Sequence, residues 1–266
     1  MKIAVLMSGF VRNLDNHKVY KKFLENNSNH DIDLFMNIYN KLGLMSPYNG
    51  NKSNDKLVNI SKEINYEDID KLWNPTILKI NNFKDTMNVI NGHCKDIEYR
   101  DKNLVIKTYS QFYMINSCFD LLDKYIEANN INYDLIIKLR TDIYYDKLII
   151  NNLSLNNSIN LFVRGDITFN EKKLIYTNDT CSFGNLNMMR EFCKLGDINR
   201  FMFCSKIAKE ICSNKKKIII KGGACHINFV GELLMTINLN YFDIPIYKHQ
   251  INYGLIRSRP KYLETL

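Results

Sequence analysis

Short apolar runs alternate with helical patterns along the first forty residues. Residues 3–7 form a continuous apolar run that ends at Ser8 and Gly9, as expected for a buried strand followed by a turn. The next apolar positions have the spacing of one helix face: Leu14, Val19, Phe23 and Leu24. A second apolar run covers residues 32–38. This order of strand, helix and strand predicts a parallel sheet.

The pattern is weaker between residues 41 and 100 and strongest just after them. Residues 43–55 are rich in turn formers and predict a loop, residues 66–73 a short helix, and residues 76–83 a strand. Residues 103–130 carry the longest helical pattern in the chain. Its apolar stripe consists of Tyr109, Phe112, Ile115, Phe119, Leu122 and Ile126.

The second half continues the alternation. A buried strand is predicted over residues 133–139, where the apolar residues stop at Leu-Arg-Thr-Asp. Further strands are predicted at 158–163, 217–220, 241–247 and 253–259, helices at 200–212 and about 227–237, and a strand or loop entering a helix at 177–195. The sum predicts one α/β domain over residues 1–266, with a mostly parallel, Rossmann-like sheet flanked by helices. We expect its C-terminal part to lie over the ligand edge of that sheet.

The charge balance points to anionic partners without selecting one. The chain of 266 residues has a formal net charge of +8, with 45% hydrophobic and 24% charged residues. Such a balance favours nucleotides, phosphorylated sugars, nucleic acid or anionic membrane, and a solvated basic surface is the plain alternative. The Lys and Arg residues are scattered, and their densest cluster is 215–217. A nucleic-acid-binding module stays open as a rival, although no RRM, KH or helix-turn-helix pattern is present.

Cysteine usage and hydropathy predict a cytoplasmic protein. The seven cysteines include no C-x-x-C pair, which argues against a disulfide framework and a zinc ribbon. A reducing compartment fits them best. No window has the roughly 18 apolar residues of a transmembrane helix, and the apolar run at the N-terminus is too short for a secretory signal. The sequence carries no signal for an oligomeric state.

Two predicted strands end in polar clusters suited to a phosphorylated ligand. Ser8, Gly9 and Arg12 follow the first strand, and Arg140 and Asp142 follow the strand at 133–139. Ligands of open α/β sheets bind at the carboxyl ends of strands, glycine allows close approach to the backbone, and arginine pairs with phosphate. A carboxylate there suits Mg²⁺ or Mn²⁺. The alternatives are a plain strand-to-helix turn and a surface Arg–Asp pair.

Other nucleotide motifs are missing. There is no G-x-G-x-x-G for a dinucleotide and no G-x-x-x-x-G-K-[ST] for an ATPase loop. A different Rossmann-like transferase, such as a methyltransferase, stays open as a further rival, although it would be expected to have a glycine-rich first loop.

Several segments in order resemble glycosyltransferases of the GT-A type, of the polysaccharide-biosynthesis kind found in bacteria and large viruses. The segments are KIAVLMSGFVRN, DIDLFMNIY, SQFYMINSCFDLL, YDLIIKLRTDIYY and NDTCSFGNLNMM. Arg-Thr-Asp stands where other GT-A enzymes have Asp-x-Asp. The resemblance covers most of the chain except roughly residues 41–100.

The resemblance implies transfer of a hexosyl or deoxyhexosyl group from a UDP- or GDP-sugar to a glycan or glycoprotein acceptor. The fold would be GT-A-like, with a nucleotide-sugar half at 1–150 and an acceptor half at 151–266. Donor contacts are implied for Ser8, Gly9, Arg12, Gln111, Arg140 and Asp142. From their place near the C-terminal end, Arg257 and Arg259 are further candidates to contact the diphosphate, and scattered surface arginines are the alternative.

The resemblance also implies candidates for catalysis and metal binding. Asp179 and then Glu232 are candidate general bases, although a turn residue and an exposed helical charge are the alternatives. Mn²⁺ or Mg²⁺ would be held by Asp142 together with a late histidine, His249 or His226. Because Arg-Thr-Asp offers one carboxylate where Asp-x-Asp offers two, metal dependence stays open.

Overall fold

A mixed eight-stranded sheet forms the centre of the molecule. The computed structural model describes residues 1–11, 14–42, 63–95, 102–141, 143–145, 148–153, 157–169, 172–213, 219–220, 231–249 and 254–255. The strand order is β3-β2-β1-β4-β7-β6-β8, and β9 also pairs with β6. The strands are β1 (Lys2–Gly9), β2 (Asp31–Tyr39), β3 (Ile77–Asn81), β4 (Leu135–Leu139), β6 (Ile159–Phe169), β7 (Lys172–Gly184), β8 (Ile219–Ile220) and β9 (Ile246–His249). A separate pair joins β5 (Ile143–Tyr144) to β10 (Gly254–Leu255).

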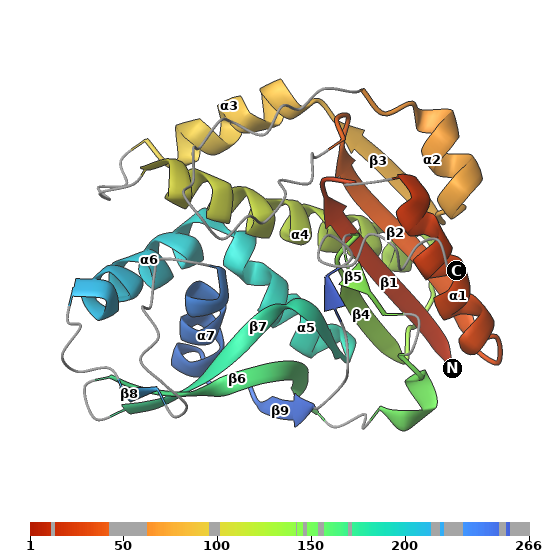
Figure 1. Cartoon of the computed structure of the whole chain (residues 1–266). Coiled ribbons are helices and arrows are strands. Elements are labelled where there is room, and N and C mark those ends of the chain that lie inside the picture. The colour runs from red at the N-terminus through yellow and green to blue at the C-terminus, as the bar shows by residue number, and fades with distance from the viewer. Residues whose placement is uncertain are drawn as a thin grey trace.

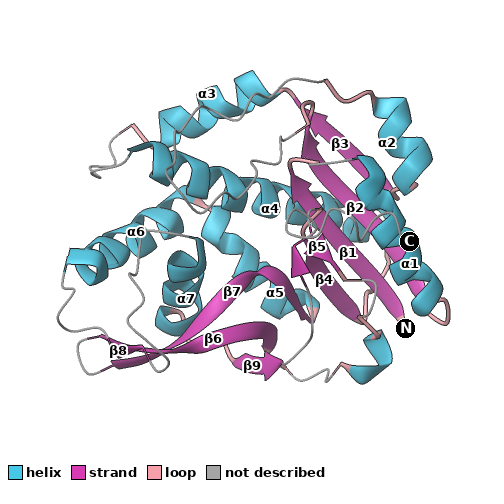
Figure 2. Cartoon of the chain, viewed as in Figure 1, coloured by secondary structure: helices cyan, strands magenta, loops and turns pink. Residues whose placement is uncertain are grey.

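Helices cover both faces of this sheet (Figures 1 and 2). They are α1 (His17–Asn26), α2 (Tyr66–Trp73), α3 (Phe83–His93), α4 (Lys102–Asn129), α5 (Leu186–Cys193), α6 (Ile198–Ser213) and α7 (Gly231–Tyr241). Three 3-10 turns add Leu14–Asn16, Ile150–Asn152 and Lys194–Gly196. The α/β class and the mostly parallel, helix-flanked sheet predicted from the sequence are confirmed.

The apolar run of β1 is continuous because both of its faces are covered. Ile3 and Val5 pack in one core with α1 and α2, whereas Ala4 and Leu6 pack in a second core with α4. Both cores include neighbouring strands, so the parallel strands are buried on two sides. Figure 1 shows the same layers, with α4 crossing behind β1 and β2.

The long helix α4 runs antiparallel to the parallel strands. Tyr125 packs edge-on against Phe35, near the middle of β2. About two turns earlier, Cys118 Sγ lies 3.6 Å from Met7 O. Earlier still, Met114 O accepts a hydrogen bond from Asn37 Nδ2 at 3.0 Å, near the carboxyl end of β2. The N-terminal half of α4 therefore lies at the carboxyl edge of the sheet.

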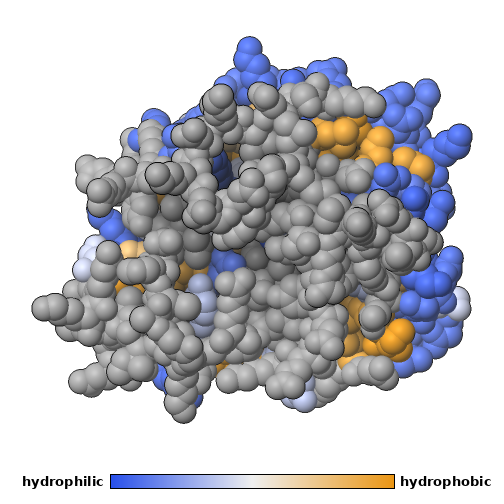
Figure 3. Space-filling model, viewed as in Figure 1, coloured by the Kyte–Doolittle hydropathy of each residue, from blue (hydrophilic) through white to orange (hydrophobic). Residues whose placement is uncertain are grey.

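The outer surfaces of α1 and α2 are polar. In the space-filling view the side of the molecule formed by these helices is largely hydrophilic (Figure 3). Lys21 and Glu25 on α1 and Glu67 and Lys71 on α2 are exposed. Even α4, with its 28 residues, is not apolar enough to cross a bilayer, and no other helix within the described ranges is. Six described cysteines form no disulfide, and five of them are buried.

Candidate functional site

The order of the parallel strands reverses between β1 and β4. The chain passes from β1 to β2 and β3 on one side and returns to β4 on the other. Both β2 and β4 pair with β1 in parallel, and Met7 lies opposite Leu139. In open α/β sheets ligands bind outside the carboxyl ends of strands at such a switch point. The two polar clusters predicted from the sequence thus follow adjacent strands.

Hydrogen bonds join the segments that follow β1 and β4. Thr141 Oγ1 donates to Phe10 O at 2.7 Å, and Asn16 Nδ2 donates to Thr141 O. The side chains of Thr141 and Asn16 are almost fully buried. This link fixes the two strand ends relative to each other. Sequence analysis did not single out either residue, because their contacts join positions more than a hundred residues apart.

Gly9 opens the edge at the end of β1. Its φ is +92°, a conformation that residues with a Cβ rarely adopt. Apart from Gly9 and its two neighbours in the chain, no atom of the described residues lies within 4 Å of the position that a Cβ would take. Ser8 precedes it, is half-buried, and lies opposite Asn37 of β2. A ligand can therefore approach the main chain closely at this point.

Neutral amides connect the ends of β2 and β3. Asn81 Nδ2 donates to Asn37 Oδ1 at 2.6 Å, and Asn40 N donates to Asn81 O at 2.8 Å. Asn40 Oδ1 accepts from Phe83 N at 2.9 Å, at the start of α3. Asn37 is fully buried. These bonds hold the edge in place without adding a charge to it.

Three aromatic rings pack beside Gly9. The Phe10 ring centroid lies 4.6 Å from that of Tyr39 and 5.3 Å from that of Phe83, and the latter two are 5.3 Å apart. Burial raises the pKa of the Tyr39 hydroxyl, so this phenol stays neutral. The cluster fixes the backbone immediately after Gly9.

Two of the predicted donor contacts lie at this edge. Arg140 is half-buried and comes directly after β4. Gln111 is half-buried on α4, three residues before Met114, which accepts the Asn37 hydrogen bond. Because α4 runs antiparallel to the strands, Gln111 lies further toward the carboxyl edge than Met114. The structure therefore places Ser8, Gly9, Gln111 and Arg140 around one edge.

Asp179 lies in a large bulge of β7. Between the pairs Val163–Thr177 and Leu161–Ser182, β6 contributes one residue and β7 contributes residues 178–181. The last pair of the β4–β7 ladder is Lys138–Ser182, so these extra residues lie just past the end of β4. Bulges commonly re-aim side chains beside active sites. Only the backbone of Asp179 is described.

Glu232 stands in the first turn of α7, near the same bulge. Thr236 Oγ1 accepts from Thr177 N at 3.1 Å, and Asn240 Oδ1 accepts from Ile175 N at 3.2 Å. Hence α7 runs antiparallel to β7. The residue one helical turn before Thr236 is Glu232, and it lies level with residue 179 of β7. Glu232 is half-buried there. The two candidate bases approach the edge from neighbouring elements.

The remaining predicted residues lie outside the description or far along the sheet. Arg12, Asp142, His226, Arg257 and Arg259 fall outside the described residues. Only the backbone of His249 is described, and the pairings from β4 through β7 and β6 to β9 place it three strands from Leu139, about 14 Å at usual strand spacing. Within the described ranges no three His, Cys, Asp or Glu side chains gather into a metal-binding group.

Comparisons with known proteins give structural likenesses only. Neither the family models nor the curated sequences match this chain. Solved structures with similar architecture include galactosyltransferase LgtC in complex with donor and acceptor sugar analogues (12% identity, TM-score 0.45, 90% of this chain and 70% of that one). Another is the glycosyltransferase GlyE of Streptococcus pneumoniae TIGR4, with 9% identity and a TM-score of 0.37 over 93% of this chain and 45% of that one. A third is the bifunctional glycosyltransferase WbbM, with 9% identity and a TM-score of 0.32 over 91% of this chain and 51% of that one. This chain spans about half the length of the latter two.

Proposed function

We propose that this protein is a glycosyltransferase that moves a sugar from a UDP- or GDP-sugar to a hydroxyl of a glycan or glycoprotein. The observation that carries the proposal is the joined carboxyl edge of β1 and β4, where the Thr141–Phe10 hydrogen bond fixes two polar strand ends side by side. Strands β1 and β4, which come from two of the segments that resemble GT-A glycosyltransferases, end at this edge.

The donor would lie across Gly9, with its diphosphate toward Arg140. None of the described residues fills the space above Gly9, which would let the nucleotide approach the backbone. The guanidinium of Arg140 is suited to bidentate pairing with phosphate. Ser8 and Gln111 would contribute hydrogen bonds from β1 and α4. Arg12 and Asp142 belong to the same proposed donor site by resemblance, and Arg257 is a further proposed contact of the diphosphate.

The reaction would displace the nucleotide from the anomeric carbon. The acceptor oxygen forms a bond to that carbon, while the bond to the diphosphate oxygen breaks and its electron pair leaves with the nucleotide. In an inverting displacement, the acceptor proton passes to a carboxylate within hydrogen-bond reach. Asp179 and Glu232 are the proposed bases, in that order, because their backbones lie side by side on β7 and α7 close to the end of β4.

Mn²⁺ or Mg²⁺ is proposed to assist the transfer reaction, with Asp142 as a protein ligand of the ion. Such an ion would offset charge on the departing diphosphate. His249 is the second proposed ligand by resemblance, and its backbone lies three strands from Leu139.

Thermal unfolding with nucleotides tests the donor site directly. A ligand at a hundred times its Kd raises the free energy of unfolding by about 2.7 kcal/mol. We expect UDP or GDP to raise Tm, and CDP and dTDP to serve as comparisons, each with and without Mn²⁺. If none of the four raises Tm, the proposal fails. Salt-dependent binding to random oligonucleotides in that case would favour the nucleic-acid-binding rival.

Hydrolysis of sugar nucleotides tests the proposed bases without a known acceptor. Asp179→Asn or Glu232→Gln should lower turnover by about 100-fold or more while the Tm shift with nucleotide is retained. Matched controls are Asp68→Asn on α2 and Glu25→Gln on α1, both exposed. Unchanged turnover in both site variants would remove these carboxylates from the mechanism.

A further inference from the structure

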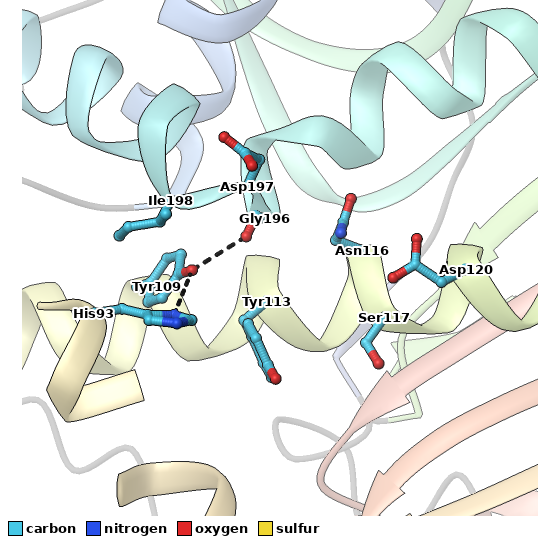
Figure 4. A pocket seen from close by; sticks show the side chains of 9 residues that line it. All are labelled: His93, Tyr109, Tyr113, Asn116, Ser117, Asp120, Gly196, Asp197 and Ile198. Carbon is cyan, nitrogen blue, oxygen red and sulfur yellow. Dashed lines mark hydrogen bonds between the residues drawn. The ribbon is translucent and has the colours of Figure 1, made fainter. Parts of the chain in front are cut away.

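A second hollow lies on the face of α4 that points away from the sheet. Its volume is about 240 Å³, and it is bordered by the end of α3, the outer face of α4 and the start of α6 (Figure 4). The contacts of Asn37 with Met114 O and of Cys118 with Met7 O lie on the opposite, sheet-facing side of the helix. The hollow is therefore separate from the carboxyl edge.

One stripe of α4 supplies hydrogen-bonding groups to this hollow. Tyr113, Asn116, Ser117 and Asp120 line it at positions i, i+3, i+4 and i+7, so they share one helix face. The side chains of Tyr113, Asn116 and Ser117 make no hydrogen bond to any other residue that the structure describes. Figure 4 shows Tyr113 and Ser117 projecting to one side of the helix and Asn116 to the other.

The walls of the hollow are held in place by packing and hydrogen bonds. Tyr109 Oη donates to Gly196 O at 3.3 Å, and His93 Nδ1 lies 3.1 Å from the same hydroxyl. A Cβ at Gly196 would overlap Phe112 O and Asn116 Cβ, so only glycine permits this close contact with α4. A wall fixed in this way loses little conformational freedom when a ligand binds.

Ring geometry and charge select the chemistry of a ligand. The His93 and Tyr109 ring centroids each lie 6.0 Å from that of Tyr113. Among the described residues of the lining, Asp120 and Asp197 are acidic and none is Lys or Arg. An anionic group is therefore disfavoured. The volume is below the 300–1,000 Å³ typical of pockets for drug-sized ligands, which suits a single ring.

We infer that this hollow, the α4 groove, binds one neutral sugar unit, with an apolar sugar face on Tyr113 and hydroxyls hydrogen-bonded to Asn116, Ser117 and Asp120. Hydroxyls both donate and accept, which matches a lining of amide, hydroxyl and carboxylate groups. Aromatic rings such as Tyr contribute contact area together with a polar group. If the proposed transferase function holds, the α4 groove would retain a glycan acceptor while its end is extended at the sheet edge.

Saturation-transfer NMR with methyl glycosides of glucose, galactose and N-acetylglucosamine tests this site. With excess UDP present to occupy the sheet edge, we expect transfer from the protein to at least one glycoside. Tyr113→Ala and Asp120→Asn should each weaken that binding by about tenfold or more. Ser117→Ala is the milder variant, with a smaller loss, in case the first two disturb α4.

Matched controls and opposite outcomes are available. Tyr66→Ala and Asp68→Asn change exposed residues of the same types on α2 and should leave glycoside binding unchanged. The inference is overturned if no glycoside receives saturation, if Tyr113→Ala binds like the wild type, or if spermidine binds the hollow in place of the glycosides. Nucleotide-induced Tm shifts report separately on the sheet edge, so failure of one site is distinguishable from failure of the other.

Discussion

At its amino end β1 begins among charges, whereas at its carboxyl end the hydrogen bonds described above join neutral groups. Lys2 Nζ lies 2.7 Å from Asp31 and 3.2 Å from Asp33, and the backbone N of Lys2 donates to Asp134 at 2.7 Å. At the other end, amides, a hydroxyl and aromatic rings surround Gly9. Among the described residues, the comparison shows ion pairs at the amino end of β1 and, at its carboxyl end, neutral hydrogen bonds beside the positive φ of Gly9.

At the amino end of β1, the carboxylate of Asp33 binds side chains from three other segments. Tyr133 Oη donates to its Oδ2 at 2.6 Å, and Thr76 Oγ1 donates to its Oδ1 at 3.0 Å. Burial alone would raise the pKa of Asp33, but the bonds from Tyr133, Thr76 and Lys2 outweigh it and lower that pKa. The ionised carboxylate thus ties β1, β2 and the segments before β3 and β4 together.

Removing the Asp33 carboxylate should have the largest effect on stability. Asp33→Ala leaves three donors without their partner and should lower the free energy of unfolding by about 2–4 kcal/mol, as measured by urea denaturation. The nucleotide-induced Tm shift should persist, because the sheet edge is untouched. Asp31→Ala is the control, and its exposed pair with Lys2 should cost less than about 1 kcal/mol. Similar losses in both variants would contradict the central role of Asp33.

The Asp33 effect should also depend on pH. Since the folded state lowers the pKa of this carboxyl, its stabilisation is complete above the pKa of the unfolded chain and is lost as pH falls through the folded value. The difference between wild type and Asp33→Ala should therefore shrink below about pH 4. A constant difference from pH 7 to acid would show that packing, not ionisation, causes it.

Gly9→Ala should cost less stability but impair the edge. A Cβ at φ +92° is strained by about 1–2 kcal/mol, and the methyl group would enter the space proposed for the nucleotide. We expect that loss in urea denaturation together with a reduced Tm shift with UDP or GDP. Gly92→Ala in α3 is the matched control. It has open space at a helical position and should stabilise the fold by about 0.5–1 kcal/mol. An undiminished nucleotide shift in Gly9→Ala would remove Gly9 from the donor site.

Thr141→Val should have the smallest effect on stability. It removes the bond to Phe10 O and should cost about 1 kcal/mol, with weaker nucleotide binding because the two strand ends are no longer joined. Thr86→Val removes a similar bond to Asn82 O at the start of α3 and should leave nucleotide binding unchanged. Equal nucleotide affinities in wild type and Thr141→Val, measured by calorimetry, would contradict a role for this link.

The sequence predicted elements whose pattern is local and missed features set by distant partners. The apolar runs of β1, β2 and β4 and the stripe of α4 were readable because burial leaves a periodic trace. Helix α3 was missed, although Asn82 caps it by accepting from Asp85 N, because its apolar positions are few and many of its residues are polar. The bulge of β7 depends on register with β6, which periodicity does not encode.

The candidate site divides in the same way. Gly9 was recognised because glycine after a buried strand has a local meaning. The Asn81–Asn37 and Thr141–Phe10 bonds were not recognised, because each joins residues on separate elements. Likewise, the level of Glu232 beside residue 179 follows from contacts between α7 and β7 that span about sixty positions.

The two faces of α4 have a consequence for the size of what this protein can hold. A helix with its side chains is about 10–12 Å across, so one sugar ring cannot touch both the sheet edge and the α4 groove. Only a chain of several units could pass around the helix and occupy both places at once. In a transferase that used both places, the thickness of α4 would set the minimum length of an acceptor that binds at both. Longer acceptors would then be retained between successive additions, while shorter ones would dissociate.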